Sequence, residues 1–210
     1  MARLTRREIL KLMGLTAGGA FLAACGRSQE TTVESSSGSP EMKGDEAMYR
    51  SILEFGVAAD NSAEANRNAL QDAIDWASSH GAALFVDPSD TPYPVAGGLT
   101  LRANVSLLGV HGPVGRGTSH PAKPQPVGSV FAIEDEQLPF LTVENATQVR
   151  GIQFWYPAQT ADDGSKIIEY PPTIQCSQTH GAQGVTLSCL TFYGEYLAMD
   201  FNAQRGRIVE

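Results

Sequence analysis

The stretch that decides the fold begins with Ile52-Leu53-Glu54-Phe55-Gly56 and ends with Asn104-Val105-Ser106-Leu107-Leu108-Gly109. Between these segments comes Asp60-Asn61-Ser62, and then a run in which apolar residues recur at helical spacing, from Ala65 to Ala77. Short apolar runs without helical spacing follow. The order predicts one amphipathic helix placed ahead of a series of short strands.

The helix is predicted over residues 62–79, and Gly81 suits its end. Exposed strand edges and open apolar stacks invite aggregation. We therefore expect the helix to cover the first strands, with Leu70 and Ile74 buried against their apolar side chains.

Short apolar runs recur after Ala82, punctuated by Gly, Asn and Pro. No second helical pattern separates them, which argues against alternating βαβ units. Irregular repeats of this kind favour a solenoid whose strands pair in parallel, and a β-sandwich with a similar number of strands is the alternative. The runs are 84–86, 99–101, 105–107, 130–133, 140–143, 149–154, 185–187, 190–192, 197–201 and 207–209.

This order of elements resembles the N-terminal part of the pectate-lyase superfamily. That family shows a Phe-Gly-Ala strand, an Asp-rich turn, a helix with an "AIQ-AID" pattern, an apolar strand ending in proline, and a Leu-rich strand pair. The matching segments here are 52–56, 60–62, 68–75, 82–88 and 99–109. The resemblance implies an all-β fold, namely a right-handed parallel β-helix (β-solenoid) with an N-terminal capping α-helix. It also implies a polysaccharide as partner, but it carries over no catalytic site.

The first 24 residues are a predicted export signal. The segment 5–11 resembles the twin-arginine motif, with Arg6 and Arg7 as its paired arginines. The apolar stretch after it is shorter than the roughly 20 residues of a membrane span. It ends Leu22-Ala23-Ala24-Cys25, which resembles the site read by lipoprotein signal peptidase, so Cys25 is the predicted lipidation site. An ordinary export signal with a chance cysteine is the alternative.

Three parts make up the predicted chain: the signal peptide (1–24), a flexible lipidated tether (25–47) and the strand domain (48–210). The tether is rich in serine and scattered acids and has few large apolar residues, so it cannot bury enough surface to fold. Two or three acyl chains on Cys25 would make a stable anchor. We predict an exported protein, lipid-anchored in the bacterial cell envelope on its periplasmic or extracellular face, which contacts the membrane only through Cys25.

The chain is acidic, with a formal net charge of −8. The first 24 residues hold four basic residues and one acid, so the remainder carries −11. Nucleic acid and anionic bilayers are therefore excluded as expected partners. A polyuronate would also be repelled, whereas neutral or weakly charged glycans are easier to accommodate.

Cys176 and Cys189 remain after Cys25 is assigned to the lipid. Both lie in apolar strand-like runs, where they could pair in an exported protein or pack as buried thiols. Both alternatives stay open. No Cys/His cluster has zinc-like spacing, so the sequence predicts no metal site of that kind.

Three carboxylates are weak candidates for catalysis, and the catalytic residues as such stay unknown. Asp162 and Asp163 are adjacent in one loop, and glycosidases use two carboxylates while lyases hold Ca²⁺ with several. Adjacent acids before a glycine are equally typical of a solvated turn. Asp200 lies near two arginines in sequence, with nothing to fix their geometry. Ca²⁺ is expected only if the protein is a lyase, and no other cofactor is evident.

Trp155, Tyr156 and Tyr170 are the candidate substrate-binding residues. Aromatic rings and prolines cluster at both ends of one loop, where they could form a platform for a sugar ring. They could equally pin the loop to the strands by apolar burial.

These observations favour an envelope-anchored protein that acts on polysaccharide, of the glycoside hydrolase or polysaccharide lyase class. A non-catalytic glycan-binding or surface module is the alternative. Because residues 206–210 end the sequence without a capping helix or polar tail, we expect the chain to be truncated at its C-terminus.

Overall fold

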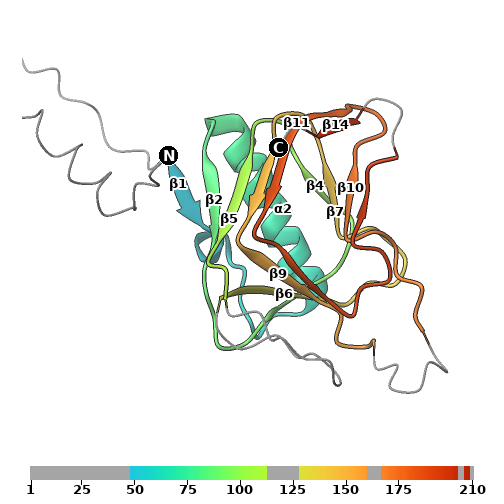
Figure 1. Ribbon diagram of the computed structural model, residues 1–210. Helices are drawn as coiled ribbons and strands as arrows, with labels where there is room; N and C mark the ends of the chain where they lie inside the picture. The colour runs from blue at the N-terminus through green and yellow to red at the C-terminus, as the bar shows by residue number, and fades with distance from the viewer. Residues whose placement is uncertain (1–47, 113–127, 160–166, 203–205, 209–210) are drawn as a thin grey trace, which may run out of the picture. The chain divides into compact units, whose positions relative to one another are not determined.

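Parallel strands dominate the computed structural model, which describes residues 48–112, 128–159, 167–202 and 206–208 (Figure 1). A short 3-10 helix, η1 (Ile52–Phe55), and an α-helix, α2 (Ala63–His80), come near the beginning of these residues. The described strands are β1 (Tyr49–Ser51), β2 (Ala83–Val86), β3 (Tyr93–Val95), β4 (Leu99–Leu101), β5 (Ser106–Gly109), β6 (Ser129–Ile133), β7 (Leu141–Val143), β8 (Gln148–Arg150), β9 (Ile152–Trp155), β10 (Ile174–Cys176), β11 (Ala182–Ser188), β12 (Thr191–Tyr193), β13 (Met199–Asp200) and β14 (Gly206–Ile208).

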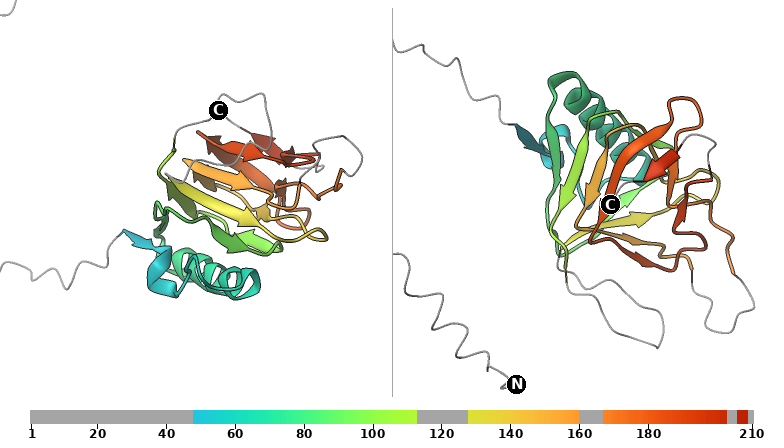
Figure 2. Two further views of the ribbon diagram at one scale, coloured as in Figure 1. Left: turned by 90° about the horizontal axis from the view of Figure 1, so that it is seen from below. Right: turned by 45° about the horizontal axis from the view of Figure 1, so that its top comes forward.

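The strands fall into three parallel sheets. Sheet A has the order β1-β2-β5-β8-β11-β14, sheet B the order β3-β6-β9-β12, and sheet C the order β4-β7-β10-β13. From β2 onward each strand pairs with the strand three places later, so one circuit of the chain adds one strand to every sheet. We call β2–β4 the first circuit and β11–β13 the fourth. Figure 2 shows the circuits stacked from α2 at one end to the fourth circuit at the other.

Parallel register places similar side chains in rows that cross the strands. The inward rows include Leu84, Leu107, Val149 and Leu187 in sheet A, and Tyr93, Phe131, Phe154 and Phe192 in sheet B. Phe140 packs against the aromatic row, with its ring centre 5.5 Å from that of Phe131 and 5.6 Å from that of Phe154. Aromatic pairs in such geometry add about 0.5–1.5 kcal/mol each beyond their apolar burial. These rows form the core.

Helix α2 closes one end of the stack by packing on β3 and β4. The Ser62 side chain caps its start by accepting a hydrogen bond from the Ala65 amide (3.2 Å), and Gly81, at φ 63°, ends it. Leu70 and Ile74 are fully buried, so the prediction of this helix and of its buried face is confirmed. In the described part of the chain, no helix has the length and apolar composition needed to cross a membrane.

The predicted all-β, right-handed parallel β-helix is wrong as a fold class. Helix α2 has 18 residues and shares one core with the strands, and the strands fall into three parallel sheets. The described residues therefore form an α/β fold. Apolar spacing identifies a helix and a strand separately, but it does not tell whether the helix lies outside the strand core or helps to build it. The parallel pairing itself is confirmed for the described strands, which excludes the β-sandwich alternative.

Candidate functional site

A pocket of about 340 Å³ opens where sheet B ends and the chain turns toward sheet C. Because β6 and β9 are parallel neighbours, the residues that follow both strands meet at the same edge of the sheet. One wall follows β6, a second follows β9, and the third precedes β10. The described lining is Ile133, Glu134, Glu136, Pro157, Ala158 and Tyr170.

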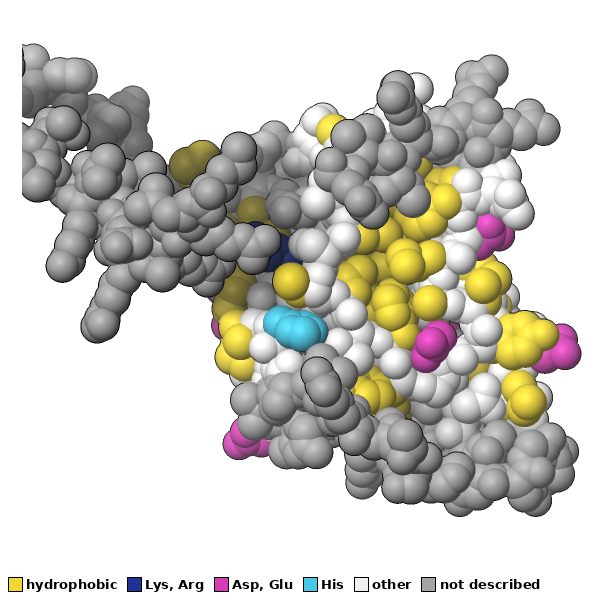
Figure 3. All heavy atoms as spheres, viewed as in Figure 1, with side chains coloured by type: hydrophobic (Ala, Val, Ile, Leu, Met, Phe, Trp, Pro, Cys, Tyr) yellow, Lys and Arg dark blue, Asp and Glu magenta, His cyan; other side chains and the backbone are white. Residues whose placement is uncertain are grey.

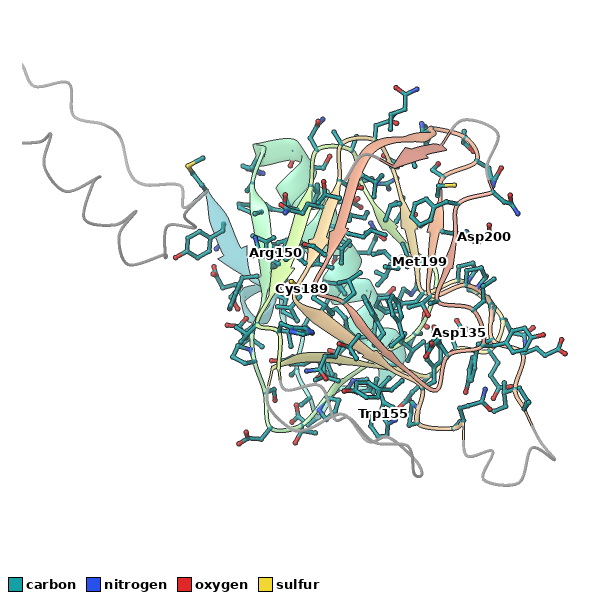
Figure 4. All side chains as sticks on the ribbon, viewed as in Figure 1. Asp135, Arg150, Trp155, Cys189, Met199 and Asp200 are labelled. Carbon is teal, nitrogen blue, oxygen red and sulfur yellow. The ribbon has the colours of Figure 1, made fainter. Side chains whose placement is uncertain are left out.

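Asp135 fixes the turn that carries the two glutamates. Its Oδ1 accepts hydrogen bonds from the amides of Gln137 (2.7 Å) and Leu138 (3.1 Å), and its Oδ2 accepts one from the amide of Gly97 (3.2 Å). Figure 4 labels Asp135 at this corner. Asp135 is thus bonded to the backbone of the turn. Its neighbours Glu134 and Glu136 are exposed and line the pocket.

Tyr170 forms the third wall and is only 3% exposed. Its ring centre lies 4.5 Å from that of Tyr156, which is itself buried and whose hydroxyl is 2.7 Å from the Thr173 hydroxyl. No hydrogen bond within the described ranges engages the Tyr170 hydroxyl. Burial raises the pKa of the Tyr170 phenol, and the negative charge of Glu136 raises it further. The phenol therefore stays neutral and can donate a hydrogen bond.

Gln159 holds the two sides of the loop base together. Its Oε1 accepts from the amide of Ile168 and its Nε2 donates to the carbonyl of Ile168, both at 3.0 Å. Gly194, at φ 73°, lies against this side chain, since a Cβ there would be 3.2 Å from the Gln159 Cβ. These contacts fix Pro157 and Ala158 relative to the residues that lead into β10.

The structure brings together some of the predicted site residues and separates others. Tyr156 and Tyr170 are in contact. Trp155 lies half-buried on the outer side of sheet B, in register with Ala132 and Tyr193, whereas Asp200 lies on sheet C, where its Oδ1 accepts from the Asn202 amide (2.9 Å). Figure 4 shows Trp155 and Asp200 well apart in the view. Arg6, Arg7, Cys25, Asp162 and Asp163 lie outside the described residues.

Glu134 and Glu136 were missed by the sequence interpretation. Their signal was present as the acidic run Glu134-Asp135-Glu136, which directly follows the apolar run ending at Ile133. Strand β6 ends at Ile133, however, so it is the turn held by Asp135 that brings both glutamates to the pocket. The sequence pattern does not show this turn.

Within the described ranges, no three His, Cys, Asp or Glu side chains lie close enough to hold a metal ion. Ca²⁺ binding by a lyase therefore stays a prediction without a ligand set among these residues. The described lining of the pocket holds two acids, fewer than the several oxygen ligands that Ca²⁺ takes.

Cys176 and Cys189 are both free thiols. Cys176 is buried in β10 of sheet C, while Cys189 is exposed just after β11 of sheet A, at φ 52°. The structure thus has no disulfide between them.

No protein-family model and no curated protein matches this chain. Among solved structures, the chain is similar to a protein from Parabacteroides merdae described as a "putative glycosyl hydrolase". The two share 10% sequence identity over 77% of this chain and 96% of the other, with a TM-score of 0.37. A likeness this distant carries no argument about activity. The resemblance to the pectate-lyase superfamily stays a prediction.

Proposed function

We propose that this protein acts on a polysaccharide, which it binds at the pocket of Glu134, Glu136 and Tyr170. One observation carries the proposal: two carboxylates, those of Glu134 and Glu136, line a single pocket together with Tyr170. Carboxylates accept hydrogen bonds from sugar hydroxyls, and a neutral phenol can donate one. Pro157 and Ala158 offer apolar surface to the C–H faces of a sugar ring.

Hydrolysis is the reaction that this lining supports best. Glycosidases use two carboxyl groups, one to protonate the leaving oxygen and one to activate water or stabilise the developing positive charge. A lyase would instead need a base next to a cation that acidifies the proton beside a carboxylate. The described lining supplies the two carboxyl groups and neither an arginine nor a lysine.

Non-catalytic glycan binding is the second candidate, and the exposure of the glutamates favours it. A catalytic general acid is usually held in an apolar environment, whereas Glu134 and Glu136 are exposed. Both candidate functions require glycan binding at the same pocket, so only a measurement of turnover distinguishes them.

The experiment is a panel of glycans tested for both binding and depolymerisation, with the wild type and the variants Glu134→Gln and Glu136→Gln. Asp72→Asn and Asp90→Asn serve as controls, since both acids are exposed, lie outside the pocket and lose the same charge. A hydrolase loses turnover in either glutamate variant while binding persists. A binder shows no turnover and loses affinity in the double variant. If no glycan is bound or cut, the proposal is wrong.

We also propose that the protein is exported and lipid-anchored through Cys25, which the signal-like sequence before it supports. Metabolic labelling with a palmitate analogue should mark the wild type and not Cys25→Ser. Equal labelling of both would refute this assignment. The tether over 25–47 would then hold the domain clear of the membrane.

A further inference from the structure

We draw no further inference here: the strongest candidate, the apolar surface that Tyr196, Leu197 and Met199 leave exposed at the fourth-circuit end of the stack, is an unpartnered face, and nothing in the structure shows what covers it.

Discussion

Gly109 and Gly151 lie side by side at the corner where sheet A turns toward sheet B. A Cβ on Gly151 would be 2.3 Å from the Gly109 carbonyl oxygen, and one on Gly109 would be 2.7 Å from the Ser129 side chain. Gly151 also has φ 74°, a conformation that side chains disfavour. The backbones of two successive circuits can approach this closely only without side chains.

Gly151→Ala should therefore destabilise the protein by about 3–5 kcal/mol, through a clash with backbone added to the cost of positive φ. Gly184→Ala is the matched control. Gly184 has a similar φ of 69°, but its Cβ would meet nothing closer than 3.8 Å, so we expect only about 1–2 kcal/mol. Urea unfolding measures both. Equal losses would mean that close approach at the corner contributes nothing.

Tyr156 should make the fold sensitive to alkali. Burial raises the pKa of its phenol well above the usual value, so the folded state resists losing the proton. A group whose pKa is higher in the folded state gives stability that is complete below the unfolded pKa, about 10, and is lost as pH rises beyond it. Tyr156→Phe should cost about 1 kcal/mol at neutral pH, because the bond to Thr173 is lost. The Tyr156→Phe variant should also lose less stability than the wild type between neutral and strongly alkaline pH. If the free energies of unfolding of the wild type and the variant changed in parallel with pH, this prediction would be wrong.

At the scale of elements, α2 is held by its buried face rather than by its surface. Leu70→Asp would place a charge at a fully buried position, which should destabilise by about 4 kcal/mol. Asn68→Asp adds the same charge on the exposed side of this helix and should stay within about 0.5 kcal/mol. Thermal or urea unfolding followed by circular dichroism separates them. Similar losses in both variants would mean that α2 does not form part of the core.

The elements were predictable where a local pattern defines them. Helical spacing of apolar residues predicted α2, and apolar runs ended by Gly, Asn or Pro predicted most of the described strands. The fold class was wrong because packing of a helix against sheets depends on contacts between distant residues. The pocket was missed for the same reason: Glu134 and Tyr170 are far apart in sequence, and only the parallel pairing of β6 with β9 brings their loops together. Tyr156 and Tyr170 were predicted as binding residues because aromatic residues at both ends of one loop are visible in the sequence. Their rings are in contact, and their binding role stays a prediction.

For the molecule as a whole, the two ends of the stack differ. Helix α2 covers β3 and β4 at one end. At the other end β12, β13 and β14 are the last described strands of their sheets, and Tyr196, Leu197 and Met199 are 42–54% exposed. Figure 3 views the molecule from this second end and shows apolar side chains gathered over the fourth circuit.

Exposed strand edges beside apolar side chains favour association between copies. We expect the Cys25→Ser chain to self-associate as its concentration rises, and Leu197→Lys with Met199→Lys to reduce this association, because lysines on the face would have to be desolvated. Leu53→Lys is the control, since Leu53 is similarly exposed (47%) but lies in η1, an element that packs against α2. Light scattering over a range of concentrations measures the mass. A mass of one chain at every concentration would show that this face is protected, and the same loss of association in the Leu53→Lys control would mean that added positive charge, rather than the fourth circuit, sets the behaviour.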